Sequence, residues 1–346
     1  MELYFLDENF SLIEVLDDFS SVVWSEKFYS VGSFTIHFPR EYVAQVKDAV
    51  YVRTSYSNGE AKCGRIERIS VRDGGDCTIG GKMLEALIGD RIIEGCGSSD
   101  GRLTDAVIAV VEENLRGCGV EIAADQPLLA DEVSLAYSYD NLADWLYSVL
   151  KPYGASFSVT LDADADKPVF RLVKGIDRSS DSSSSEQAAV FSSSFGNIVS
   201  LDFERNESGT KNAVYVEGAD KTVVLVDRSG IGKRREFHSL EKTITPDDYD
   251  STEAYKAALY QRGLELLAEY TGGMRVSAEC DADALPLYGR DYSLGDLCDV
   301  CDNDVGLSFA LRITEVDTVS ENGRTTVFPS FGDEIRSIKK LYRSGT

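Results

Sequence analysis

The sequence is poor in histidine, proline and basic residues. Its 346 residues include 2 His, 7 Pro and 35 Lys or Arg against 59 Asp or Glu, which gives a formal net charge of −24. Because such a surface repels phosphates over about a Debye length, ordinary DNA binding is disfavoured. The acidity serves either solubility alone or a surface that DNA must pass without adhering.

Long apolar runs are also absent. No stretch approaches the 18 or more apolar residues of a membrane-spanning helix. The first ten residues, MELYFLDENF, lack the basic segment and the apolar run of a signal peptide. We therefore expect a protein that is made and kept in a cytosol, or assembled into a particle there.

The seven cysteines are an odd number at irregular spacing, which favours reduced thiols over a disulfide framework. Cys298 and Cys301 have a metal-like spacing, but a structural zinc site needs four ligands, and neither a second pair nor a nearby His supplies them. We expect these two to be strand residues, one or both of them buried, and we expect no metal. The others are Cys63, Cys77, Cys96, Cys118 and Cys280.

Signatures of catalysis are missing as well. His37 and His238 lie in strand-like segments without the Gly-x-Ser-x-Gly elbow of many hydrolases, although a Ser-His-Asp arrangement stays open on these residues alone. No phosphate-binding loop of the Gly-x-x-x-x-Gly-Lys-Ser/Thr type is present. Asp162, Asp164 and Asp166 lack the glycine and closing glutamate of a calcium loop, so we interpret them as solvated turn residues. We assign no catalytic, cofactor-binding or metal-binding residue.

The length of the chain predicts two or three domains. Residues 1–80 contain successive short apolar runs separated by turn residues, a pattern typical of an antiparallel barrel or sandwich. From residue 199 strands return, interrupted by one helix at about 251–271, which Asp250–Glu253 opens as a capping box. Both ends of the chain are therefore predicted to be strand-rich.

The part between them, residues 95–198, has a different pattern. Helical periodicity occurs over Leu103–Leu115 and again from Leu142 to Leu150, where Pro152 ends the second helix. Two strands and a serine-rich polar loop follow, at 156–161, 169–174 and 177–186. This part is predicted to be α+β.

An internal echo links the two strand-rich parts at an offset near 247 residues. Each copy has a leading strand, a second strand, a glycine turn and a strand that ends at glycine: 50–54, 64–69, 74–75 and 80–81, then 297–301, 311–316, 322–323 and 331–332. Chance likeness between β-meanders is the alternative, but the constant offset favours duplication. We expect a mainly β fold in which two related antiparallel β-barrel-like tube modules, residues 1–94 and 199–346, flank an inserted α+β region, residues 95–198.

One basic cluster interrupts the acidic chain. Gly230–Arg235 lies on a predicted hairpin turn. It is either a contact for an acidic neighbouring subunit or an exposed turn with no partner.

Several strings occur in an order and spacing that resemble one family. They are VWSEKFYSVGSFTIHFP at 23–39, GGKMLEALIGDRII at 80–93, VFSSSFGN at 190–197, KNAVYVEG at 211–218, RRE at 234–236, DYSLGD at 291–296 and RITEV at 312–316. On these strings the chain resembles the siphovirus ReqiPepy-type tail proteins, relatives of the baseplate hub and tail-associated proteins. The likeness runs nearly end to end.

The resemblance implies a structural phage or prophage tail protein that is not an enzyme and has no cofactor. It implies a subunit of the baseplate hub, which joins tail tube to tail tip and encloses the DNA channel, with the virion tail as its location and the bacterial cytoplasm as its site of assembly. The implied partners are two further copies in a homotrimer and the distal tail and tip or fibre proteins. Genome DNA is expected to pass without specific binding, and no membrane partner is expected.

Two alternatives stay open. A cell-wall hydrolase in residues 95–198 would need a cleft with convergent, perturbed carboxylates or a metal. A receptor- or carbohydrate-binding module would need Trp145, Tyr147 or Tyr153 exposed in a groove, although helical spacing favours Trp145 in the core. Some relatives carry an additional C-terminal peptidase or hydrolase; about fourteen residues follow Gly332, so none is expected here.

Overall fold

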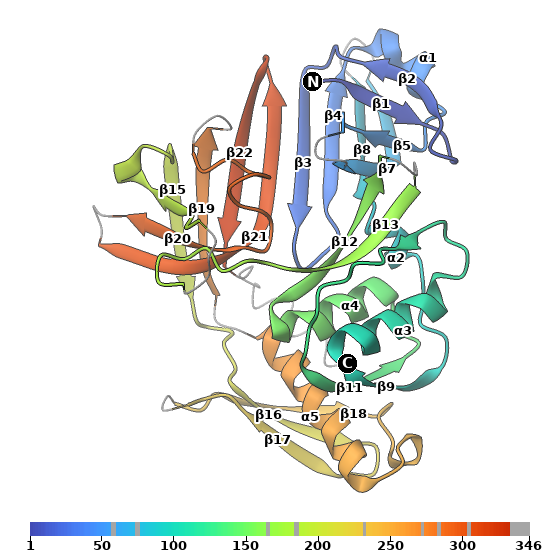
Figure 1. The fold of residues 1–346 in the computed structure, drawn as a ribbon, viewed down its shortest axis with the longest axis vertical. Coiled ribbons are helices and arrows are strands. Elements are labelled where there is room, and N and C mark those ends of the chain that lie inside the picture. Colours follow the sequence, from blue (N-terminus) through green and yellow to red (C-terminus); the bar gives the residue numbers. More distant parts are fainter. Residues whose placement is uncertain are drawn as a thin grey trace.

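Strands form most of the regular structure of the chain, which confirms the prediction of a mainly β fold (Figure 1). The computed structural model describes residues 1–56, 60–72, 77–163, 167–182, 187–230, 233–270, 273–281, 285–302 and 306–332. Two β lobes lie side by side at the top of Figure 1, and helices with smaller sheets lie below them.

The N-terminal lobe consists of β1 (Leu3–Leu6), β2 (Leu12–Leu16), β3 (Ser21–Lys27), β4 (Ser33–Phe38), β5 (Tyr51–Arg53), β7 (Cys63–Val71) and β8 (Cys77–Met83), with the short turns η1 (Arg40–Tyr42) and α1 (Val43–Val46). Alternate residues of β3 and β4 are apolar and buried, such as Trp24 and Phe34. Because successive side chains of a strand point to opposite faces, this alternation places one face on a core.

The C-terminal lobe consists of β14 (Val190–Ser192), η3 (Ser193–Phe195), β15 (Ser200–Asn206), β19 (Gly273–Asp281), β20 (Leu297–Asp302), β21 (Leu307–Glu321) and β22 (Arg324–Phe331). Its own core is centred on Phe191, Tyr292, Ile313 and Phe331. The rings of Phe191 and Phe331 meet edge to face, with centroids 5.0 Å apart.

One sheet of 13 strands runs through both lobes in the described residues. Its main path is β15-β19-β22-β21-β3-β4-β8-β7-β5-β1-β2, and β20 pairs with β14 and β21 beside it. This path is open, with β15 and β2 at its ends. The barrel-like closure of each module therefore stays a prediction.

The two segments of the internal echo have the same strand arrangement. β5-β7-β8 and β20-β21-β22 are both antiparallel meanders. Each meander also carries an irregularity at one corresponding place, between Ile66 and Arg68 in β7 and between Ile313 and Glu315 in β21. Bulges bend a strand at defined positions, so the shared bulge extends the likeness from sequence to backbone geometry.

The chain between the lobes contains α2 (Ala86–Gly89), β9 (Cys96–Arg102), α3 (Leu103–Leu115), β10 (Glu121–Ile122), β11 (Glu132–Ser138), α4 (Leu142–Leu150), η2 (Lys151–Tyr153), β12 (Ala155–Asp162) and β13 (Lys167–Lys174). Helices α3 and α4 begin and end where the periodicity predicts, whereas α2 was not predicted. Asn141 caps α4, since its side chain accepts hydrogen bonds from Ala143 N at 3.1 Å and Asp144 N at 3.2 Å.

A further unit interrupts the C-terminal lobe between β15 and β19. β16 (Ala213–Gly218), β17 (Val223–Asp227) and β18 (Glu236–Glu241) form a sheet of their own, and after η4 (Pro246–Asp248) the helix α5 (Thr252–Glu269) covers it (Figure 1). Gly263 permits close packing of α5 on β17, because a Cβ at this position would lie 2.3 Å from Val226 Cγ2. The unit starts and ends on paired residues, since Asn206 faces Gly273 across β15 and β19.

The predicted boundaries at 94/95 and 198/199 are crossed by strand pairing. β6 (Glu60–Ala61) pairs with β12, and β14 pairs with β20. The division into residues 1–94, 95–198 and 199–346 stays a prediction.

Candidate assembly surfaces

The two lobes are joined by pairing of β3 with β21, here called the internal junction. Seven residue pairs run from Lys27–Glu315 to Ser21–Glu321. Lys27 Nζ lies 3.1 Å from Glu315 Oε1 and Arg275 Nη2 lies 2.9 Å from Glu315 Oε2. Although burial acts to raise it, the pKa of Glu315 is lowered overall by these two cations. The internal junction therefore combines backbone pairing with a partly buried ion network.

A second connection forms where the DYSLGD segment meets the end of β3. Gly295 has φ +93°, and a Cβ there would lie 2.3 Å from the ring of Phe28. Gly295 N donates to Ile313 O at 2.9 Å, and Phe28 N donates to Thr314 O at 2.9 Å. Glycine is needed here both for its backbone conformation and for the space that the ring occupies.

Asp296, the last residue of that segment, is the centre of a buried polar cluster. It is 2% exposed, and its carboxylate accepts from Arg178 Nε at 2.8 Å, Ile176 N at 2.7 Å and Ser293 N at 2.9 Å. The segment before β14 is thereby held against the C-terminal lobe. The DYSLGD string contributed to the family resemblance, but nothing in the sequence identified Arg178 as the partner of Asp296.

The described part of the basic cluster has acidic partners within the chain. Arg234 pairs with Glu236 at 3.0 Å and with Asp227. Hydrogen bonds from Ser229, and then from Arg234, lower the pKa of Asp227 to about 2. A contact with an acidic neighbouring subunit stays a hypothesis.

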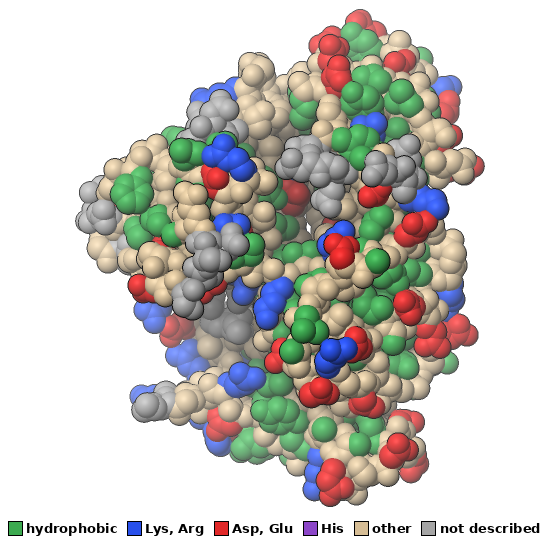
Figure 2. Space-filling view, viewed as in Figure 1, with side chains coloured by type: hydrophobic (Ala, Val, Ile, Leu, Met, Phe, Trp, Pro, Cys, Tyr) green, Lys and Arg blue, Asp and Glu red, His purple; other side chains and the backbone are tan. Residues whose placement is uncertain are grey.

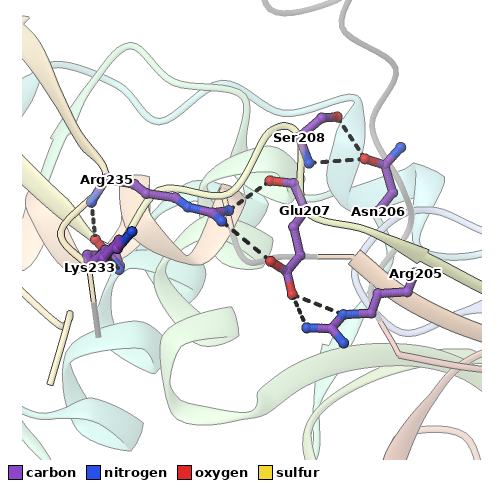
Figure 3. A network of polar contacts seen from close by, with 7 residues as sticks. Arg205, Asn206, Glu207, Ser208, Lys233 and Arg235 are labelled. Atoms are coloured by element: carbon purple, nitrogen blue, oxygen red, sulfur yellow. Dashed lines mark hydrogen bonds and ion pairs between the residues drawn. The ribbon is translucent and has the colours of Figure 1, made fainter. Parts of the chain in front are cut away.

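Figure 3 shows how this turn is attached to the end of β15. Glu207 lies between two arginines, accepting from Arg205 Nε at 2.9 Å and lying 3.3 Å from Arg235 Nη2. Arg235 also donates to the Glu207 carbonyl at 2.9 Å, and its own N–H donates to Asn212 Oδ1 at 2.7 Å. These contacts orient β15 relative to the β16–β18 sheet.

The structure does not bring the two histidines together. His37 is in β4 of the large sheet, with Nδ1 3.1 Å from Thr78 Oγ1, whereas His238 is in β18, with Nε2 2.8 Å from Glu217 Oε2. Asp162 ends β12. Asp164 and Asp166 lie outside the described residues.

Cys298 and Cys301 both lie in β20, as expected. Cys298 is buried and Cys301 is half-buried, with Sγ 3.4 Å from Ser308 Oγ. Residues three apart in a strand point to opposite faces, which does not suit a shared metal. Within the described ranges, no group of three or more His, Cys, Asp or Glu residues is placed to hold a metal ion.

The aromatic residues that a receptor-binding groove would need are mostly internal. Trp145 is 4% exposed and donates from Nε1 to Ala136 O at 2.9 Å, and Tyr147 is 7% exposed. Tyr153 is half-buried and donates to Gln261 Oε1 at 2.8 Å. Trp145 is thus a core residue, as its helical spacing predicts.

A cavity of about 300 Å³ lies between α4, β11 and α5, lined by Asp144, Glu241, Glu265 and Glu269 among others. Glu265 is 3% exposed, and its pKa is raised to about 7 by burial, against the opposing effect of Arg262, which lies 3.0 Å away. This cavity has the features that a hydrolase site would need, a carboxyl group with a raised pKa beside further carboxylates.

A larger cavity, of about 640 Å³, lies between the lobes and β12. Glu85 reaches it from the end of β8, and Val159 N donates to its Oε1 at 3.4 Å. Oε2 is buried and has no hydrogen-bond partner in the described part of the chain. Burial raises the pKa of Glu85 to about 7, with a smaller contribution from Glu26.

This architecture of two like β lobes with interposed α and β elements is shared by solved tail proteins. The tail protein from Neisseria meningitidis MC58 is 13% identical, with a TM-score of 0.57 over 93% of this chain and 94% of that one. Prophage tail protein gp18 from Listeria monocytogenes EGD-e is 13% identical, with a TM-score of 0.57 over 99% and 98%. The 43 kDa tail protein of prophage MuSo2 from Shewanella oneidensis is 12% identical, with a TM-score of 0.56 over 96% and 98%.

The fold is therefore that of structural tail proteins of phages and prophages. The chain belongs to the siphovirus ReqiPepy6 Gp37-like protein family, whose model matches residues 1–333. The resemblance seen in the sequence is confirmed. No curated protein matches the chain. Within the described residues, no helix is both long and apolar enough to span a membrane.

Proposed function

We propose that this tail protein is a subunit of the baseplate hub, where it forms a homotrimer whose six β lobes make a ring around the DNA channel. The observation that carries the proposal is the repeated meander, β5-β7-β8 and β20-β21-β22, with its bulge at corresponding positions. A threefold assembly whose subunits each hold two like modules continues a sixfold tube without a symmetry mismatch. In this proposal the modules are residues 1–94 and 199–346, flanking the 95–198 insertion, and assembly completes their barrel-like sheets.

The acidic surface supports passage of DNA without adhesion. The net charge is −24, and Figure 2 shows Asp and Glu at the upper right, along the right margin and at the lower end of the face drawn. A polyanion is repelled by such a wall at short range. The expected partners along the axis are the distal tail and tip or fibre proteins, and the expected location is the virion tail.

The test is the mass of the purified full chain by light scattering over a range of concentrations, with negative-stain images of the same samples. The proposal predicts three times the 37.9 kDa of one chain, and ring-shaped particles. A monomer at every concentration, with no rings, would contradict the homotrimer.

A second candidate function, cell-wall hydrolysis, is favoured by one feature, the acidic cavity that contains Glu265. A general acid needs a raised pKa near a second carboxylate, and Glu241 and Glu269 line the same cavity. Zymography on cell walls tests this function. Clearing by the native chain that is lost in Glu265→Gln would establish it, and no clearing by either would exclude it.

A further inference from the structure

We propose that neighbouring copies join edge to edge, β7 of one copy pairing antiparallel with β15 of the next, in the register that β21 and β3 use inside the chain. This inference rests on the proposed ring and names the contact that closes it. The occupant of each edge is thus a second copy of this chain.

At the internal junction, β21 uses two parts of one edge. Leu307–Arg312 pairs with β20, and Glu315–Glu321 pairs with β3, while β22 occupies the opposite edge. β7 is built in the same way: Cys63–Arg65 pairs with β5, and β8 occupies the opposite edge. Beyond β5, however, the edge of β7 over residues 68–71 has no paired strand in the part of the chain that the structure describes.

β15 is the counterpart of β3 in the C-terminal lobe. In each lobe, four residues are paired side by side across four adjacent strands, starting at the bulge. Across β7, β8, β4 and β3 they are Ile66, Gly81, Phe34 and Trp24. Across β21, β22, β19 and β15 they are Ile313, Phe331, Val276 and Phe203. Trp24 in β3 therefore corresponds to Phe203 in β15. The outer edge of β15, which corresponds to the edge of β3 that meets β21, is likewise unpaired among the described residues.

Transferring the register gives specific pairs between copies. Thr318 faces Trp24 at the internal junction, and its counterpart in β7 is Val71, so Val71 of one copy faces Phe203 of the next. The next pair along is Arg72 with Asp202. Val71 and Phe203 already lie in ladders on their inner edges. The second pair extends β7 by one residue, since Arg72 follows its last residue, Val71.

The exposure of these side chains supports the pairing. Trp24 is 1% exposed, whereas its counterpart Phe203 is 39% exposed and Val71 is 45% exposed. Both lie on the core face of their strands, since Val71 pairs with buried Cys77 and Phe203 with buried Val276. An added strand would cover them as β21 covers Trp24.

The charges also match in this register. Arg72 and Asp202 carry opposite charges and face each other, an arrangement that stabilises adjacent antiparallel strands. Unpaired edge strands promote aggregation unless they are covered, and neither edge contains proline within residues 68–72 or 200–206 to block pairing. Pairing between copies therefore uses two edges that would otherwise be a hazard.

Disulfide cross-linking tests the register. Chains carrying Val71→Cys are mixed with chains carrying Phe203→Cys, both in a Cys77→Ala, Cys96→Ser background, because Cys77 lies directly opposite residue 71 in β8 and Cys96 is exposed. The full chain is used at a concentration at which light scattering shows the trimer. After mild oxidation, non-reducing gels should show cross-linked dimers.

The matched control replaces Phe203→Cys by Glu204→Cys. A shift of one residue places the two thiols on opposite faces of the sheet, so cross-linking should be about tenfold slower or more. Equal rates for the two mixtures in a trimeric sample would overturn the register while leaving the trimer intact. Cross-linking of either cysteine to another protein in purified tails, and not to a second copy, would overturn the choice of partner.

Exchange of the facing charges gives a second measurement that does not depend on thiol geometry. Arg72→Asp and Asp202→Arg should each weaken the trimer by about fivefold, and the double variant should restore it. Single variants that assemble like the native chain would overturn the contact. Absence of any trimer from the native chain would instead refute the proposed function, so the two failures are distinguishable.

Discussion

Replacing Asp296 by Ala tests whether the buried cluster holds the C-terminal lobe together. The carboxylate lies 2.8 Å from Arg178 Nε and accepts two backbone N–H groups, from Ile176 and Ser293. The Arg178 and Asp296 side chains are 11% and 3% exposed, so water cannot replace the lost partner. Removing one member of a buried ion pair costs about 3–5 kcal/mol, because the remaining charge stays buried after losing that carboxylate. We expect a loss of that size in the free energy of unfolding.

The assay is guanidinium unfolding followed by circular dichroism, with Asp105→Ala as the matched control. Asp105 pairs with Arg102 at 2.6 Å, but these side chains are 57% and 51% exposed. An exposed pair contributes about 1 kcal/mol or less, even with its place in the first turn of α3. A loss of stability in Asp296→Ala no larger than that in Asp105→Ala would show that the buried cluster does not hold the C-terminal lobe together.

Two further predictions concern stability. The pKa of Glu85 is raised to about 7 from an ordinary 4.5, so its stabilising contribution is present below about pH 4.5 and is lost as the pH rises through 7. The free energy of unfolding of the native chain should therefore fall by about 3 kcal/mol over this pH range, and that of Glu85→Gln, measured by denaturant unfolding, should not. Parallel pH profiles for the native and variant chains would contradict this. Gly295→Ala should lower the melting temperature more than Gly289→Ala, because both glycines have positive φ but a Cβ at Gly295 would also meet Phe28; equal melting temperatures would count against this.

Local features were predictable from the sequence because their causes are local. Helix α4 follows from the apolar spacing of Leu142–Leu150 before Pro152. Helix α5 was expected from a capping box at Asp250–Glu253, but its cap is Ser251, whose Oγ accepts from Ala254 N at 3.1 Å, so the helix starts one residue later than that box predicts. The repeated meander was visible because both copies keep their turn residues.

Long-range pairing was not predictable in the same way. The strands β16 to β18 were expected, but their separation into an independent sheet depends on which strand finds which partner. The internal junction joins residues almost 300 positions apart, as in Ser25 and Glu315, whose side chains are hydrogen-bonded at 3.3 Å. Alternation shows that a strand has a buried face without showing what lies at its edge. The Arg178–Asp296 cluster was missed for the same reason.

The position of the β16–β18 and α5 unit between paired residues of β15 and β19 makes it a replaceable cassette. Asn206 and Gly273 are neighbours across the ladder, so 66 residues occupy the place of a hairpin loop. Lengthening a loop costs little closure entropy, since each doubling adds only about 0.6 kcal/mol. This cassette, and any partner that it contacts, can therefore change in evolution without disturbing either lobe.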